Sequence, residues 1–270
     1  MSFVTLAALA IALTLDRSPA AAQSAQWDLA RARTAYNERR FDEAVIAASA
    51  ARSLPETADT GAIVLSRALL ERYRERADPA DLSAAREALG TVRTSALEER
   101  DQLELLLAFG EALFLEDDFG AAAEVLESGL NRAAVAAPEI AESMLEWWGS
   151  ALERKASGLD PEQRKGHFMR LAERMQEELA RTPSSLAASY WSVVGLRGAG
   201  ELDRAWDSAI AGWVRARLAG ERSAGLRADL DHLVLQGVIP DRAGRMTQER
   251  RPAATSQMKA EWELVKERWK

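Results

Sequence analysis

The sequence predicts an all-α protein built from repeated helical hairpins, and three observations support this expectation. Alanine, the strongest helix former, occupies 53 of the 270 positions, against 16 glycines and 8 prolines. The prolines fall between apolar stretches of helical period and not inside them. Small and apolar residues recur at matching spacings in several of these stretches. We therefore expect helices joined by short turns along most of the chain.

The first residues have the layout of an export signal. An apolar run of 13 residues, from Phe3 to Leu15, precedes Pro19 and a stretch of small residues that reaches Ala22. This layout is typical of a secretory signal peptide over residues 1–22, although the usual basic segment before the apolar run is lacking. Thirteen helical residues span about 20 Å, which is less than the hydrocarbon core of a membrane. The sequence predicts a periplasmic or secreted protein with no stable membrane span.

Composition limits the chemistry that the chain can perform. It contains no cysteine, which excludes disulfides, thiolate metal sites and a lipid-anchored lipoprotein. The formal net charge of −7 disfavours nucleic acid as a partner. His232 follows Asp229 by three residues, but a metal site needs three or four ligands and no third is indicated. We expect no metal, no cofactor and no nucleic-acid partner.

Prolines mark where helices begin and end. Asp160 precedes Pro161, and Gln163 follows it by three residues, so the segment has an N-cap, a proline in the first helical position and a capping-box residue. The same interpretation applies to Asp78-Pro79, Ala137-Pro138 and Thr182-Pro183, whereas Pro55 closes a helix. The resulting segments are joined by short turns, as expected for a string of helical hairpins.

The hairpins are related to one another by the spacing of their small residues. Gly110 and Ala122 are twelve residues apart, and Gly129 follows Ala122 by seven. Ala32 and Ala44 are also twelve residues apart. Small residues are needed where two helix backbones approach closely, and larger apolar residues fill the space between neighbouring helices. The spacing therefore predicts one hairpin per repeat.

This arrangement resembles the tetratricopeptide repeat over approximately residues 25–219. The resemblance implies a right-handed α-solenoid of about five hairpins, in which the first helix of each hairpin lines a concave surface that binds peptides or helices. An apolar stripe over residues 226–234 predicts a capping helix. We expect a repeat domain over residues 23–237, a mobile linker over 238–254 and an amphipathic helix over 255–270.

The terminal helix carries two tryptophans on one face. Met258, Trp262, Val265 and Trp269 recur at spacings of four, three and four residues. An exposed stripe of this kind is unfavourable in water, so the helix must dock on something. Docking on its own solenoid and docking on a partner both remain open.

The resemblance also locates a partner-binding surface on the first helix of each hairpin. Glu104 and Glu111 are seven residues apart, as are Glu146 and Glu153, so each pair shares one helix face. Together they predict an acidic strip that favours a basic amphipathic segment, with solvated helix faces as the alternative. The predicted partner-binding residues are Arg33, Tyr36, Asn37, Glu104, Leu107, Glu111, Phe114, Leu115, Glu146, Ser150, Glu153, Trp262 and Trp269.

The expected function is a non-catalytic scaffold or adaptor that binds a protein or peptide in this groove. Two alternatives stay open. Glu142-Ser143 resembles the Glu-Ser pair of lytic transglycosylases, which would make the chain a peptidoglycan-cleaving enzyme of the cell envelope. The capping helix and tail would instead assemble copies of the chain into a structural subunit. No phosphate-binding glycine loop, nucleophile elbow or His-Glu-x-x-His motif is present.

Overall fold

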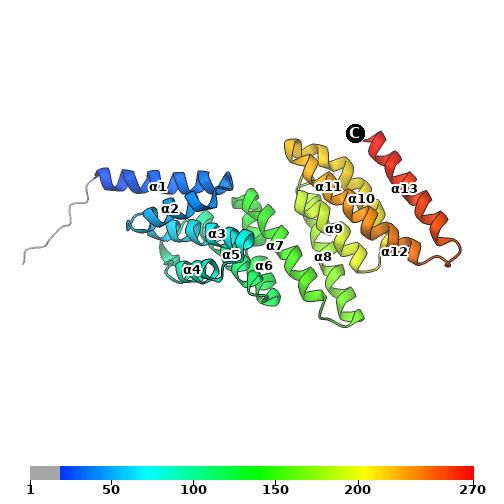
Figure 1. Ribbon diagram of the computed structural model, residues 1–270, viewed down its shortest axis with the longest axis horizontal. Helices are drawn as coiled ribbons and strands as arrows, with labels where there is room; N and C mark the ends of the chain where they lie inside the picture. Colours follow the sequence, from blue (N-terminus) through cyan, green and yellow to red (C-terminus); the bar gives the residue numbers. More distant parts are fainter. Residues whose placement is uncertain (1–18) are drawn as a thin grey trace, which may run out of the picture. The chain divides into compact units, whose positions relative to one another are not determined.

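The computed structural model describes residues 19–270, which are helical almost throughout and contain no strand (Figure 1). The all-α prediction is confirmed. The chain divides into two compact units, one reaching Arg93 and one running from Thr94 to Lys270, whereas the sequence suggests a single repeat domain over 23–237. Most of the expected signal peptide over residues 1–22 lies outside the described residues.

The first unit consists of two helical hairpins. Its helices are α1 (Pro19–Asn37), α2 (Phe41–Arg52), α3 (Ala58–Arg76) and α4 (Pro79–Gly90). Each helix packs on the next, and α1 also packs on α3. Ala35, Ala44 and Ala68 form a buried cluster where α1, α2 and α3 meet. The methyl side chains of these residues let the three helices lie close together, as the repeat spacing predicts.

Charged residues at the helix ends close the second hairpin of this unit. Arg72 of α3 donates a hydrogen bond from Nε to Asp81 Oδ2 of α4 at 2.8 Å. Asp59, in the first turn of α3, accepts hydrogen bonds from the backbone amide of Arg93 at 2.9 Å and from its Nη2 at 2.8 Å. The start of α4 and the segment that follows its end are therefore tied to α3.

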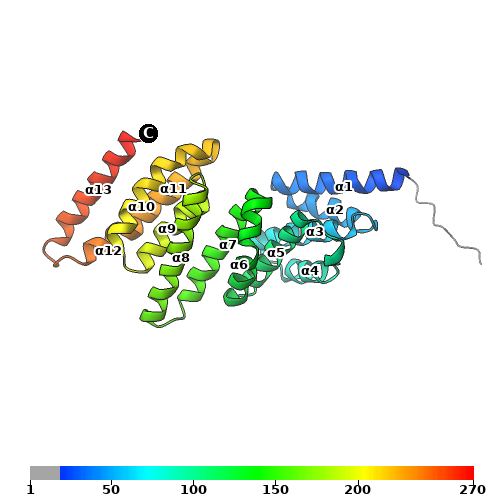
Figure 2. The same cartoon turned by 180° about the vertical axis from the view of Figure 1, so that it is seen from behind.

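The second unit is also built from helices that follow one another along the chain and pack side by side (Figures 1 and 2). Its repeat helices are α5 (Glu99–Leu115), α6 (Phe119–Ala136), α7 (Pro138–Ala156), α8 (Pro161–Arg181), α9 (Leu186–Gly198), α10 (Leu202–Arg215) and α11 (Ser223–Leu233). Besides packing on its sequence neighbours, α7 packs on α5 and on α9, and α9 packs on α11. Helices α5, α7, α9 and α11 thus form one continuous layer of odd-numbered helices, which is the packing expected of a helical repeat.

Small residues lie at the helix crossings of this unit, as the spacing predicts. A Cβ on Gly110 would lie 2.4 Å from Leu126 Cγ, and one on Gly129 would lie 2.9 Å from Met144 Cε. Ala122 is completely buried in α6. A side chain at Gly110 or Gly129 would therefore force Leu126 or Met144 of the neighbouring helix to shift.

The prolines mark helix starts in three of the four predicted places. Helices α4, α7 and α8 begin at Pro79, Pro138 and Pro161. Asp160 caps α8 by accepting hydrogen bonds from two backbone amides at 3.0 Å. The expected start at Thr182-Pro183 is wrong, because α9 begins at Leu186, where the Ser185 side chain accepts a hydrogen bond from the amide of Ala188.

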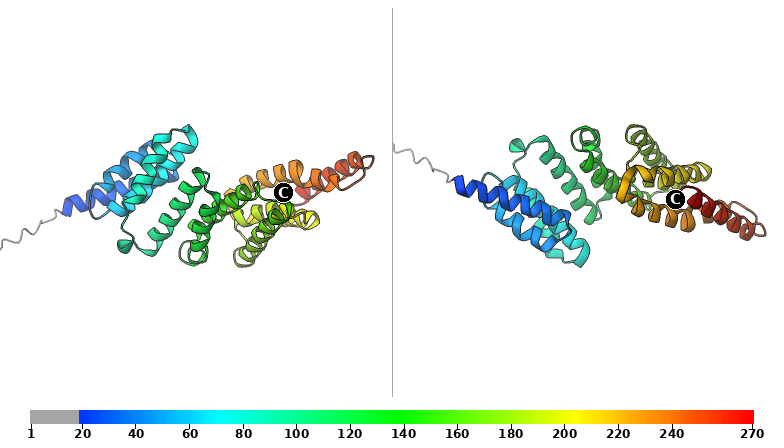
Figure 3. Two further views of the ribbon diagram at one scale, coloured as in Figure 1. Left: turned by 90° about the horizontal axis from the view of Figure 1, so that it is seen from below. Right: turned by 90° about the horizontal axis from the view of Figure 1, so that it is seen from above.

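The end of the chain is more helical than expected. A π-helical segment, Val234–Val238, leads directly from α11 into α12 (Ile239–Gly244), and α13 (Arg251–Arg268) follows a short turn. A linker was expected over residues 238–254, but Ile239 and Ala243 are buried and Pro240 occupies the first turn of α12, where a proline is tolerated. Figure 3 shows the second unit from two further sides, with α13 in red.

Helix α13 docks within its own unit. Trp262 is completely buried, and its ring packs edge to face on Trp206 and Trp213 with centroids 5.9 and 5.5 Å away. Its Nε1 donates a hydrogen bond to Asp231 Oδ1 at 2.8 Å, and Lys266 Nζ pairs with the same oxygen at 2.8 Å. The assignment of Trp262 to a partner-binding surface is therefore wrong, because this unit already covers it. Trp269 is 40% exposed.

Candidate functional site

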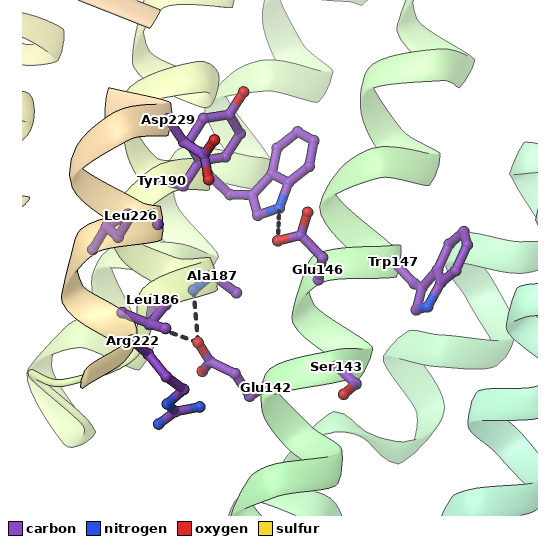
Figure 4. A pocket seen from close by; sticks show the side chains of 12 residues that line it. Glu142, Ser143, Glu146, Trp147, Leu186, Ala187, Tyr190, Arg222, Leu226 and Asp229 are labelled. Carbon is purple, nitrogen blue, oxygen red and sulfur yellow. Dashed lines mark hydrogen bonds between the residues drawn. The ribbon is translucent and has the colours of Figure 1, made fainter. Parts of the chain in front are cut away.

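A cavity of the second unit lies on α7, α9 and α11, in the layer of odd-numbered helices. It has a volume of about 600 Å³ and is open to solvent. Three carboxylates, one arginine and three aromatic residues from α7, α9 and the region of α11 contribute to it (Figure 4). The lining residues are Glu142, Ser143, Glu146, Trp147, Leu186, Ala187, Tyr190, Trp191, Arg222, Gly225, Leu226 and Asp229. We call this cavity the α7–α9–α11 pocket.

The base of the pocket is fixed by a glycine, a tryptophan and a glutamate. Gly149 of α7 leaves room for the Trp191 ring of α9, since a Cβ there would lie 2.4 Å from Trp191 Cδ2. Trp191 is 3% exposed, and its Nε1 donates a hydrogen bond to Glu146 Oε2 at 2.9 Å. The buried indole therefore holds the exposed Glu146 carboxylate at the pocket wall (Figure 4).

A second glutamate joins α7 to the beginning of α9. Glu142 Oε1 accepts hydrogen bonds from the backbone amides of Leu186 at 2.6 Å and Ala187 at 2.7 Å, and its Oε2 accepts one from Ser185 Oγ at 2.8 Å. These amides belong to the first turn of α9, where the helix dipole favours a negative charge. Glu142 thus caps α9 from a neighbouring helix. These hydrogen bonds support a structural role for Glu142, which drew attention in the sequence because Glu142-Ser143 resembles the Glu-Ser pair of lytic transglycosylases.

The opposite wall carries a tyrosine and an aspartate. Asp229 of α11 and Tyr190 of α9 lie together at one end of the pocket, and Glu146 faces them from α7 (Figure 4). Burial raises the pKa of Tyr190, and the negative charges of Glu153, Asp229 and Glu146 raise it further. The positive charge of Arg197 lowers this pKa in part, but the net shift is upward, so Tyr190 is a neutral phenol at neutral pH.

Arg222 occupies the other end of the pocket. It precedes α11 and is exposed, with its side chain on the side of Glu142 in Figure 4. The pocket is therefore polarised along its length. Asp229 and Glu146 lie toward the end that holds Tyr190, and Arg222 lies with Glu142 toward the other end (Figure 4).

The structure brings one of the four glutamates of the predicted acidic strip into this pocket. Glu146 lines it, and Glu153 lies two turns beyond on α7, where desolvation raises the pKa of its carboxyl. Glu104 and Glu111 of α5 are 7% and 2% exposed, and Glu104 lies 3.4 Å from Arg100. A solvent-facing strip of all four is therefore wrong. Leu107 is 1% exposed and belongs to the core, so its predicted contact with a partner is also wrong.

The remaining predicted residues do not line the pocket. Phe114 is half-buried and packs edge to face on Trp147 at 5.1 Å, which directs the Trp147 ring away from Asp229 (Figure 4). Leu115 and Ser150 are also half-buried. Arg33, Tyr36 and Asn37 belong to α1 of the first unit, where Tyr36 packs on Phe41 and beneath Arg67.

Sequence reasoning missed most of the pocket. Tyr190 and Trp191 attract attention only as aromatic residues at helical spacing, which is equally typical of a core. Arg222 gives no signal, and Asp229 attracts attention only through its spacing from His232, because solvated charges are common on helices. The pairing of Glu146 with the Trp191 indole spans 45 residues and is not visible in local periodicity.

The comparisons with known proteins add no name to this site. No protein-family model, curated protein or solved structure matches the chain. Residues 19–270 hold no group of three or more histidine, aspartate or glutamate side chains suited to a metal ion. The same residues include no helix that is long and apolar enough to cross a membrane. The geometry of the pocket is therefore the basis for any functional proposal.

Proposed function

We propose that this chain is a non-catalytic scaffold of the tetratricopeptide type that binds a peptide segment of another protein across the odd-numbered helices of its second unit. The α7–α9–α11 pocket is the observation that carries this proposal. Its volume of about 600 Å³ is within the range of specific ligand sites, and its walls combine aromatic surface with a few charged groups. Both are features of surfaces that bind side chains of a partner.

The rigidity of the pocket supports the same proposal. Glu142 and Trp191 connect α7 and α9 by hydrogen bonds, and Gly149 permits their close packing. A preformed site loses little conformational freedom when a ligand binds, so a small number of contacts suffices for affinity. The proposal also includes export to the periplasm or extracellular space, which rests on the sequence of residues 1–22.

The test is a peptide selection combined with a variant that closes the pocket. Gly225 lines the pocket on α11, and a Cβ there would meet no atom within 4 Å. Gly225→Phe therefore adds a ring at the pocket without a backbone clash, and Gly225→Ala is its matched control. Random twelve-residue peptides displayed on phage are selected on the purified full chain. The affinities of the enriched peptides for wild type and both variants are then measured by fluorescence anisotropy.

The expected result is at least one enriched peptide that loses about tenfold or more in affinity for Gly225→Phe and keeps its affinity for Gly225→Ala. Circular dichroism and thermal unfolding of both variants serve as folding controls. Failure to enrich any peptide, or enriched peptides that bind Gly225→Phe as well as wild type, would overturn the proposal.

A further inference from the structure

We propose that the α7–α9–α11 pocket takes an arginine side chain of the partner, with the guanidinium between Glu146 and Asp229 and against the Tyr190 ring. This inference rests on the proposed function and deepens it, since it assigns the chemistry of the bound segment. It follows from three features of the pocket: the placement of its carboxylates, the half-buried Tyr190 ring beside Asp229 and the position of Arg222.

The carboxylates of the pocket are not equivalent. The charge of Glu142 is directed at the amides of Leu186 and Ala187, which offset it locally. Asp229 projects from α11 beside Tyr190, and Glu146, which accepts the hydrogen bond of the Trp191 indole, lies on the facing wall formed by α7 (Figure 4). Two carboxylates on facing walls of one cavity attract a cation that enters between them.

The aromatic residue distinguishes a guanidinium from other cations. Tyr190 is half-buried and lines the same pocket as Glu146 and Asp229, with its ring beside Asp229 (Figure 4). A planar guanidinium stacks on such a ring while its five N–H groups reach carboxylates on both sides. A lysine ammonium is a compact and strongly hydrated charge, and it satisfies this geometry less well. The fixed position of Glu146, set by Trp191, suits the directional hydrogen bonds of arginine.

The position of Arg222 predicts the direction in which its removal changes the affinity of the pocket for a cation. Arg222 lies in the same pocket but at the end away from Asp229 (Figure 4). Because like charges repel, its removal favours a bound cation, whereas removal of Asp229 disfavours one. The two substitutions are therefore expected to change arginine affinity in opposite directions.

The experiment uses N-acetyl-arginine amide as the probe and N-acetyl-citrulline amide as its uncharged isostere. Binding is followed by two-dimensional NMR through the Trp191 indole N–H signal, which is assigned by its disappearance in Trp191→Phe. This proton lies on the hydrogen bond to Glu146 and reports directly on the pocket. Asp229→Asn and Arg222→Gln test the two charges, and Asp207→Asn, at an exposed position on α10, is the matched control.

Arginine amide is expected to shift the Trp191 signal in a saturable manner, with an affinity about tenfold or more above that of the citrulline amide. Affinity is expected to fall about two- to fivefold in Asp229→Asn, to rise in Arg222→Gln and to stay unchanged in Asp207→Asn, as the strength of exposed ion pairs implies. Equal shifts by both probes, absence of a shift, or a fall in affinity in Arg222→Gln would overturn the inference.

The two proposals fail in different ways. Enriched phage peptides that require the open pocket but contain no arginine would overturn the arginine inference and leave the scaffold function intact. Binding of arginine amide without any enriched peptide would overturn the scaffold function and with it the assignment of the arginine to a partner protein.

Discussion

Replacement of Trp262 is the most direct test of how α13 is held. The side chain is completely buried and packs between Trp206 and Trp213. A tryptophan buries about 200 Å² of surface, which corresponds to about 5 kcal/mol at about 25 cal/mol per Å². Measured tryptophan-to-alanine substitutions in cores cost about 3–5 kcal/mol. Met258 is the other buried side chain of α13, so this loss removes most of the apolar contact of the helix.

We therefore expect Trp262→Ala to release α13 while the preceding helices stay folded. Hydrogen exchange followed by mass spectrometry measures this directly, because undocked helical amides exchange far faster than docked ones. Trp262→Phe keeps an aromatic ring but loses the hydrogen bond to Asp231, and it is expected to have an intermediate effect. Trp269→Ala, at a 40% exposed position, is the control and is expected to change little. Unchanged protection of α13 in Trp262→Ala would refute the reasoning.

Three further substitutions probe the packing and the electrostatics. Gly149→Ala forces a Cβ against the Trp191 ring and is expected to destabilise the fold by about 1–3 kcal/mol in thermal unfolding; unchanged stability would contradict the packing. Glu142→Gln weakens the cap of α9 and is expected to lower stability by about 1 kcal/mol in urea unfolding, with faster amide exchange at the start of α9. Burial opposes ionisation of Asp59, but hydrogen bonds from Arg93 lower its pKa below the usual 3.8. Asp59→Asn is therefore expected to be less stable than wild type above pH 3.8, and this difference in stability is expected to disappear as the pH falls through the lowered pKa. Thermal unfolding of both proteins at pH 7 and pH 3 would check this.

The helix boundaries illustrate how far local sequence reaches. Pro79, Pro138 and Pro161 mark helix starts because the missing amide and fixed φ angle of proline suit only the first turn of a helix. Pro183 does not mark a helix start, because α9 begins three residues later, at Leu186, where the Ser185 hydroxyl caps it. The spacing of Gly110 and Gly129 correctly predicted close helix crossings, since only small side chains permit them.

The pocket shows where local sequence stops being informative. Glu146, Tyr190 and Asp229 come from three helices separated by some 40 residues each, and no local period connects them. The same limit explains the errors over Glu104 and Glu111. Helical spacing places two residues on one face, but it does not say whether that face meets solvent or protein.

The sequence by itself therefore determined the all-α class, the starts of α4, α7 and α8, the close crossings and the apolar face of α13, because each depends on residues within a few turns of one another. The tertiary structure alone decided that α13 docks on its own unit, through the contact of Trp262 with Trp206 and Trp213 and its hydrogen bond to Asp231. It also decided which glutamates meet solvent. Burial is a property of the assembled layers, and it is fixed only when helices distant in the chain pack against each other.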